Sequence, residues 1–305
     1  MLKPRRLQSG DRVSVVAPAS PFDRELFEKG VSELRRLGYD PVFDDQVFDR
    51  ERYVAGSAAR RAKSLTDAWS DPSVAGIFAV RGGYGSAQLL PLLDPAIARA
   101  AAKPFIGCSD LTALLVFLTT CCETVGFHGP MLVNLAEGES GYDRASLLGA
   151  VAQPAPIGAL APDGVEALQG GEARGRLLGG TLTQLVASLS TPYTFAPPDG
   201  YVLLLDDVGE RPYRVDRMLT QLAQSGLLRR ASAVVCAEFP DCVDSEGCDA
   251  RSVFTEQLSG FPGPVLFGFP TGHTAGPLWT LPLGVDVTVQ TGPTPRIVVE
   301  ESAVR

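Results

Sequence analysis

The chain has 305 residues, of which 45% are hydrophobic and 20% are charged, a composition that indicates a folded globular protein and excludes a disordered one. Its formal net charge of -8 argues against nucleic acid as the main partner, because binding to phosphates needs clustered Lys and Arg side chains. No apolar stretch approaches the roughly 20 residues of a membrane helix, and the basic start is not followed by the apolar run of a secretion signal, so we expect a cytoplasmic protein that does not act at a membrane.

The first half of the chain alternates strand and helix patterns. Short apolar runs predict buried strands at 13–17, 41–43, 76–80 and 103–106. Helical periodicity predicts helices at 24–37, 58–69 and 111–118, with a further one through 88–90. Repeated strand–loop–helix units with short connections predict an α/β fold with a doubly wound parallel sheet, in which reactive groups gather at the carboxyl ends of the strands.

The segment 153–171 changes in character, because it is rich in Pro, Ala and Gly and has no clear period. We interpret it as a linker between a domain at 1–152 and a second, α+β domain at 172–305. The tail from 284 to 300 alternates as an antiparallel strand pair does. Within the second domain, strands are expected at 176–178, 201–205, 233–237 and 265–267, and helices at 181–189, 214–224 and 251–258.

The segment around Ser109 has the layout of a nucleophile elbow. An apolar run leads into Gly107, and Ser109 then stands at the start of a helical pattern. A helix N-terminus leaves N–H groups unpaired and positive, close to the place where a negative oxygen forms on a carbonyl under attack. The oxyanion donors are expected to be the amides of Asp110, directly after the serine, and of Gly83, where no Cβ blocks close approach.

A serine nucleophile needs a general base, and the chain has only two histidines. His273 lies in a loop beside Gly272 and is the preferred base. His128 follows an apolar strand candidate and is expected to support the cleft through local hydrogen bonds. Asp206 is the first carboxylate after a buried strand, so it is the preferred acid to hold the histidine tautomer.

The six cysteines include no C-x-x-C pair and are expected to be free thiols. Cys236, Cys242 and Cys248 recur every six residues beside acidic side chains. Zinc usually takes tighter Cys pairs, so an acidic surface loop is the default interpretation and a metal site the alternative. Residues 81–85 lack the Gly-Lys-Ser/Thr ending of a phosphate loop and the six-residue dinucleotide pattern, and we expect neither metal nor cofactor.

A series of short blocks runs through the chain: 81–85 (RGGYG), 107–114 (GCSDLTAL), 127–131 (FHGPM), 178–182 (LGGTL), 205–219 (LDDVGERPYRVDRML), 272–274 (GHT) and 280–284 (TLPLG). In this order they resemble the LD-carboxypeptidases, a family of serine peptidases that also holds the microcin-immunity hydrolases. Each block alone is a modest signal, and together they are specific.

The resemblance implies a Rossmann-like N-terminal domain with the nucleophile, a C-terminal domain with the acid and histidine, a cleft between them, and a homodimer that needs no metal. The family serine and histidine map to Ser109 and His273. The family acid, usually glutamate, maps to Asp206, with Glu210 as the alternative. Cys108 stands where the family usually has an aromatic residue, and we expect it to pack in the core.

The resemblance also implies the reaction, which is release of the terminal D-alanine from a murein tetrapeptide in the cytosol. Arg81 and Tyr84 are the candidate substrate-binding residues, although Arg81 could equally support its turn. Hydrolysis of a peptidyl or aminoacyl nucleotide is the alternative, and Trp279 near the histidine could stack on adenine. An α/β-hydrolase esterase and a catalytically dead ligand-binding module remain as further interpretations.

Overall fold

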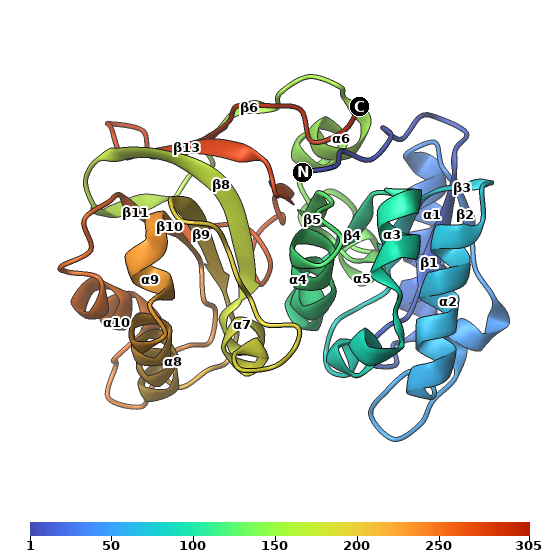
Figure 1. Cartoon of the computed structure of the whole chain (residues 1–305), viewed down its shortest axis with the longest axis horizontal. Coiled ribbons are helices and arrows are strands. Elements are labelled where there is room, and N and C mark those ends of the chain that lie inside the picture. The colour runs from blue at the N-terminus through green and yellow to red at the C-terminus, as the bar shows by residue number, and fades with distance from the viewer.

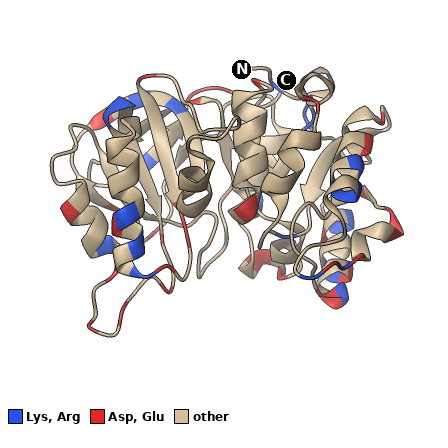
Figure 2. Ribbon diagram, turned by 60° about the horizontal axis from the view of Figure 1, so that its bottom comes forward, with Lys and Arg blue, Asp and Glu red and all other residues tan.

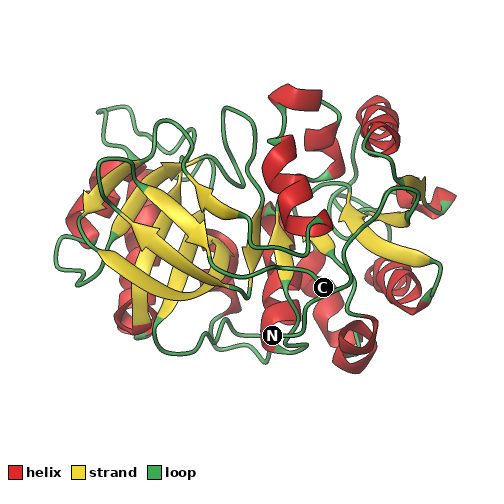
Figure 3. Cartoon of the chain, turned by 90° about the horizontal axis from the view of Figure 1, so that it is seen from above, coloured by secondary structure: helices red, strands yellow, loops and turns green.

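The computed structural model describes residues 1–305. The chain builds two β-sheets with packed helices, one mainly from each half, and the two halves lie side by side (Figure 1; Figure 3). The two chain ends meet between the halves, where the N–H of Arg6 donates to the carbonyl of Arg305 and the N–H of Arg305 donates to that of Pro4.

The first sheet has six strands in the order β12-β5-β4-β3-β1-β2. Its parallel strands are β1 (Arg12–Val16), β2 (Asp40–Val42), β3 (Val74–Ala79), β4 (Phe105–Gly107) and β5 (Gly126–His128). This arrangement confirms the predicted parallel, Rossmann-like sheet. The sixth strand, β12 (Leu281–Leu283), comes from the far end of the chain and pairs antiparallel with β5.

The two longest helices of this half begin at residues whose side chains cap them. Asp23 caps α1 (Arg24–Arg36), and Ser57 caps α2 (Ala58–Ser70). The expected helix through 88–90 is instead the 3₁₀ segment η2 (Ser86–Leu92), which contains Pro91. The other helical segments are η1 (Asp45–Phe48), α3 (Pro95–Ala101), η3 (Ser109–Leu111), α4 (Thr112–Thr120), α5 (Leu132–Leu135), η4 (Gly138–Ser140) and α6 (Arg144–Ala152).

The second sheet has eight strands in the order β6-β14-β13-β8-β9-β10-β11-β7. Its centre is parallel and consists of β8 (Glu172–Thr181), β9 (Tyr201–Asp206), β10 (Ala231–Ala237) and β11 (Val265–Phe269). The strands β13 (Asp286–Gln290) and β14 (Arg296–Val299) form the antiparallel pair predicted for the tail. The helices of this half are α7 (Leu182–Ser188), α8 (Pro212–Gln224), α9 (Leu227–Arg230) and α10 (Ala250–Gln257).

The segment 153–171 contains two strands that the sequence interpretation overlooked. The strand β6 (Gly158–Leu160) pairs with β14, and β7 (Glu166–Gln169) pairs with β11, both antiparallel. These strands are three and four residues long and stand among Pro and Gly, so they lack the length at which alternation becomes visible. The description of this segment as a plain linker was wrong in this respect.

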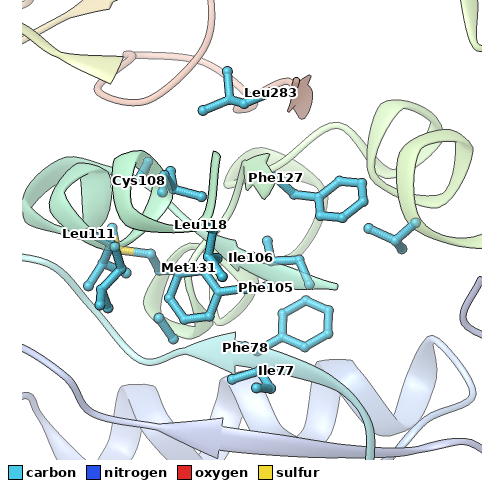
Figure 4. Close-up of a cluster of buried hydrophobic side chains, with 14 of the residues drawn as sticks. Ile77, Phe78, Phe105, Ile106, Cys108, Leu111, Leu118, Phe127, Met131 and Leu283 are labelled. Atoms are coloured by element: carbon cyan, nitrogen blue, oxygen red, sulfur yellow. The ribbon is translucent and has the colours of Figure 1, made fainter. Parts of the chain in front are cut away.

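Buried apolar side chains surround β4, the strand that ends two residues before Ser109. The side chains of Phe78, Phe105, Ile106 and Phe127 are fully buried there, and Figure 4 shows them projecting from neighbouring strands. Burial of each side chain of this size contributes roughly 1.5–3 kcal/mol to folding. The cluster also takes in Cys108, Leu111, Leu118, Met131 and Leu283.

The charged side chains gather mainly on the outer helices at the two ends of the molecule (Figure 2). The helices in the middle, where the halves meet, carry few of them. None of the helices is both long and apolar enough to cross a membrane.

Candidate active site

Ser109 stands at a sharp turn between the first sheet and a helix. Its φ of 63° lies in the left-handed region, which is uncommon for a residue with a side chain and is typical of a nucleophile elbow. A Cβ on Gly107 would lie 2.4 Å from Cδ1 of the buried Leu111, so a larger residue at this position would displace that side chain. The chain then continues through η3 into α4, which places Ser109 at the start of the helical segment, as predicted.

The three residues expected to form a triad lie in hydrogen-bond contact. Nε2 of His273 is 3.0 Å from Oγ of Ser109. On the other side of the ring, Nδ1 is 3.0 Å from Oδ2 and 3.2 Å from Oδ1 of Asp206. Ser109 follows β4 of the first sheet, whereas Asp206 ends β9 and His273 follows β11 of the second. The site therefore lies between the two halves.

Asp206 is held from several directions. Its side chain is fully buried, and its Oδ1 accepts the backbone N–H of His273 at 2.8 Å. The hydroxyl of Thr181, at the end of β8, donates to Oδ2 at 3.1 Å. A Cβ on Gly272 would lie 2.4 Å from the carboxyl carbon of Asp206, so glycine lets the His273 loop come this close. These contacts fix the carboxylate against the imidazole.

Glu210, the alternative acid, points elsewhere. Its carboxylate is 2.5 Å from Nε of Arg214, four residues on. The shorter reach of Asp206 is sufficient because the His273 loop is drawn in over Gly272. Of the two acids, Asp206 is the one that contacts His273.

The environment of His273 favours a histidine that can take up a proton. Burial lowers the pKa of His273, but the hydrogen bond and charge of Asp206, with a contribution from Asp207, outweigh burial and leave it above 6.5. The His273 side chain keeps 22% of its surface exposed, so a substrate can still reach the ring.

Gly82 packs directly against the nucleophile. A Cβ on this residue would lie 2.7 Å from Cβ and 2.9 Å from Oγ of Ser109, and 3.2 Å from the backbone nitrogen of Asp110. The N–H groups of Asp110 and Gly83 donate to no protein acceptor. The space beside Ser109 is thus kept free by a glycine and is bordered by an unpaired amide, which suits a developing oxyanion.

The side chain of Asp110 ties this space to both halves. Its Oδ2 accepts the N–H of Ser86 at 2.8 Å, and the Ser86 hydroxyl donates to the Asp110 carbonyl at 2.6 Å. From the second half, Nε2 of Gln184 donates to Oδ1 at 3.1 Å. Asp110 therefore connects the elbow with the segment that carries Gly82 and Gly83.

The two candidate substrate-binding residues lie on the loop after β3. Arg81 is exposed, and its guanidinium donates to the carbonyl of Pro21 at 3.3 Å. Tyr84 is 50% exposed and meets Tyr53 edge to face, with the ring centroids 5.4 Å apart. Both side chains are therefore accessible on the loop that borders Ser109.

His128 lies behind the acid and does not contact the serine. It is fully buried, its Nδ1 is 3.1 Å from the hydroxyl of Thr271, and its Nε2 is 3.9 Å from Oδ2 of Asp206. Burial is the main cause that lowers the pKa of His128 to about 4; Asp206 raises it and His273 lowers it further. His128 is thus a neutral neighbour of the acid.

The cysteines do not form a further reactive centre. Cys108 packs in the apolar cluster of Figure 4, and burial, with the charge of Asp206, raises the pKa of its thiol well above the usual value. Cys236 and Cys242 are buried whereas Cys248 is exposed. No group of three or more His, Cys, Asp or Glu side chains is arranged to hold a metal ion.

Comparison with known proteins identifies the family. Residues 13–129 match the profile of the LD-carboxypeptidase N-terminal domain, and residues 174–289 match that of the C-terminal domain. The chain belongs to the LD-carboxypeptidase family. This result confirms the resemblance inferred from the sequence blocks.

Three relatives show how far the similarity extends. A protein of Streptomyces coelicolor that is named as a carboxypeptidase is 38% identical, and the match covers 93% of this chain and 92% of the relative. The murein tetrapeptide carboxypeptidase of Pseudomonas aeruginosa is 34% identical, and the match covers 87% of this chain and 88% of the relative. The microcin C7 self-immunity protein MccF of Escherichia coli is 27% identical over 93% and 91%. A solved MccF structure matches with a TM-score of 0.89 over 100% of both chains at 23% identity, which shows the shared LD-carboxypeptidase fold.

Several residues of the site were not singled out from the sequence. The sequence interpretation named Gly83 and not Gly82. The Gly–Gly doublet is visible in the sequence, but only the packing shows that Gly82 is the glycine next to the serine. Thr181 follows another Gly–Gly doublet at a strand end, and that position was a usable signal. No sequence signal marks Tyr53, because a lone Tyr in a loop is common and its contact with Tyr84 depends on the tertiary fold.

Proposed function

We propose that this protein is a serine LD-carboxypeptidase that releases the terminal D-alanine from murein tetrapeptides. The observation that carries the proposal is the run of contacts from Ser109 through His273 to Asp206. A hydroxyl, an imidazole and a buried carboxylate in this order perform acyl transfer. Family membership and the murein-specific name of one relative support the choice of a peptide substrate.

In the proposed reaction, Ser109 attacks the carbonyl carbon of the bond before the C-terminal D-amino acid. Nε2 of His273 takes the hydroxyl proton and passes it to the leaving amine. Asp206 keeps the other ring proton on Nδ1 and stabilises the imidazolium. Water then attacks the acyl-enzyme, with His273 again as the base, and frees Ser109.

The developing oxyanion occupies the space that Gly82 leaves free beside Ser109. The amide N–H groups of Asp110 and Gly83 are its proposed donors. Unpaired donors that are already in place need no reorganisation when the charge forms, which is the source of their effect on the rate.

An exopeptidase must also recognise a free terminal carboxylate. Arg81 is the proposed partner, because a guanidinium can bind a carboxylate with two parallel hydrogen bonds. Tyr84 is the proposed apolar contact on the same loop. Both side chains are exposed, which supports a role in binding.

We further infer the setting of the reaction from the family pattern. The proposed domains are residues 1–152 and 172–305, with 153–171 leading from one to the other and adding β6 and β7 to the second sheet. The proposed assembly is a homodimer in the cytoplasm. The two family profiles, which end at 129 and begin at 174, are compatible with this division.

Hydrolysis of a peptidyl or aminoacyl nucleotide is the alternative, and similarity to MccF is the observation that favours it. The ring of Trp279, considered for adenine stacking, is half-buried and meets Phe269 edge to face at 6.3 Å. Binding to adenine through Trp279 would therefore have to use the remaining exposed part of the ring.

The test compares substrates on the purified full chain. Release of the terminal alanine is measured from a synthetic murein tetrapeptide and from the same peptide ending in L-alanine. Turnover of an aminoacyl-sulfamoyl adenosine is measured in a separate assay. We expect release from the D-alanine peptide alone. Turnover of the adenosine compound without release of D-alanine would replace our proposal with the alternative, and turnover of neither would contradict both.

A further inference from the structure

Arg61 is a buried cation without an acidic partner. It lies on α2, only 3% of its surface is exposed, and none of the ion pairs in the structure includes it. Four of its five N–H donors bond to neutral oxygens instead: Nε donates to the carbonyl of Gly56 at 3.0 Å, Nη1 to those of Pro18 and Gly85 at 2.6 and 2.8 Å, and Nη2 to Oε1 of Gln88 at 2.6 Å.

The acceptors of Arg61 belong to different segments. Pro18 follows β1, Gly56 lies between β2 and α2, and Gly85 follows β3. These strands are neighbours in the parallel sheet, so their following loops meet at one edge. A buried charge is costly unless its hydrogen bonds are fully met. An apolar side chain could pack α2 on the sheet, but it could not join these loops.

The loop that Arg61 reaches is the one that borders the nucleophile. Gly85 is its last glycine, and the guanidinium lies so close that a Cβ on Gly85 would be 2.9 Å from Nη1. Ser20 holds the same loop from another side: its N–H donates to the carbonyl of Gly82 at 3.2 Å, and its hydroxyl accepts the N–H of Tyr84 at 3.0 Å.

Asp110 supplies a third anchor through Ser86. Between these anchors, the N–H of Gly83 is left without a protein acceptor. The loop is thus fixed at Gly82, Tyr84, Gly85 and Ser86, while one amide between them stays available.

We propose that Arg61 is a positioning residue that holds the loop at 81–86 so that its free amide faces the oxyanion beside Ser109, with Ser20 as a second support. This inference rests on the proposed serine mechanism. Arg61 touches no substrate, and it acts through the carbonyl of Gly85. A loss of this support moves an oxyanion donor, and a misplacement of about 1 Å costs about 100-fold in rate.

The experiment compares Arg61→Gln, Arg61→Lys and Ser20→Ala with a control, Lys63→Met. Lys63 lies on the same helix, and its side chain is 74% exposed. Two rates are measured on the folded fraction: labelling of Ser109 by a fluorophosphonate, which needs no peptide substrate, and D-alanine release. Amide hydrogen exchange reports on the loop at 81–86.

We expect Arg61→Gln to slow both rates by about 10–100-fold, with the loss mainly in kcat and faster exchange confined to the loop. Arg61→Lys keeps the charge without the fork of donors, so it recovers part of the rate. Ser20→Ala is expected to slow the reaction about fivefold, as loss of one hydrogen bond does, and Lys63→Met is expected to match wild type.

The inference is overturned if folded Arg61→Gln labels within twofold of wild type, or if slow labelling comes with faster exchange across the whole first half. If Arg61→Gln does not fold, the labelling rate and amide exchange of Arg61→Lys and Ser20→Ala test the inference by the same criteria. If the wild-type protein is labelled but releases no D-alanine, the proposed peptide substrate is contradicted, and the labelling rates alone test the role of Arg61. If the wild-type protein shows neither labelling nor D-alanine release, the serine mechanism is contradicted, and so is the proposed role of Arg61.

Discussion

Nε2 of His273 lies 3.0 Å from Oγ of Ser109, although 164 positions separate the two residues in the chain. The contact exists because the two halves dock on each other: β12 from the end of the chain completes the first sheet beside β5, and β12 and α4 pack against β8 of the second sheet. The N–H of Thr181 adds a further link when it donates to the hydroxyl of Thr112 at 3.0 Å. The site therefore forms only when the two halves of the molecule are docked.

The identity of the acid can be tested with two amide variants. In Asp206→Asn, the carboxylate that stabilises the imidazolium is lost and the histidine tautomer is no longer fixed, so we expect kcat to fall by about 10³–10⁴-fold. Glu210→Gln is the matched control, because Glu210 pairs with Arg214 and should retain activity within a few-fold. Steady-state release of D-alanine measures both, and the opposite ranking would assign the acid to Glu210.

The pH dependence should show the raised pKa of His273. A general base works only in its neutral form, so kcat/KM should fall as the pH drops through the folded-state pKa of His273, which lies above 6.5. The same raised pKa stabilises the fold below pH 6.5, and that contribution is lost as the pH rises through the folded value. A kcat/KM profile from pH 5 to 9 with its acid midpoint clearly below 6.5 would contradict this view of the site.

The space beside Ser109 should tolerate no extra carbon atom. In Gly82→Ala, the new methyl group would press on Cβ and Oγ of Ser109, and we expect activity to fall by about 10²–10³-fold, as for loss of an oxyanion donor. The control is Gly260→Ala, because a Cβ there meets nothing within 4 Å. Circular dichroism checks the fold of both, and a Gly82→Ala enzyme with normal kcat would show that the oxyanion lies elsewhere.

His128 should make the fold sensitive to acid. Its pKa is lowered from 6.5 to about 4 because it is fully buried, so it contributes stability above pH 6.5 that is lost as the pH falls through its folded value. The loss reaches about 3 kcal/mol near pH 4. Urea unfolding at pH 7 and pH 4 measures it, and His128→Asn should show a smaller difference than wild type. An equal difference in the two proteins would place the acid sensitivity in other groups.

The parts of the site that local patterns define could be predicted from the sequence. Ser109 is marked by a strand, a glycine and a helix start within a few residues, and Asp206 is marked as the first polar residue after a buried strand. These signals depend only on neighbours in the chain, and the structure has both features where expected. The parallel sheet of the first half follows from the same short-range alternation of strands and helices.

The features that depend on contacts between distant segments could not be predicted in this way. The pairing of β12 with the first sheet joins residues more than 150 positions apart, and nothing in the sequence near Leu281 indicates its partner His128. Arg61 reads as one more charged residue on the outer face of a helix, yet it is buried against three loops. The short strands β6 and β7 follow from the edges that neighbouring strands offer them.

Replacement of Ser109 tests the central claim most directly. D-alanine release from a murein tetrapeptide is measured with wild type, Ser109→Ala and Cys108→Ala, the last as a control for the adjacent thiol. We expect Ser109→Ala to lose about 10⁵–10⁶-fold in kcat while Cys108→Ala, if folded, keeps a rate close to wild type. Undiminished release by Ser109→Ala would contradict the serine mechanism.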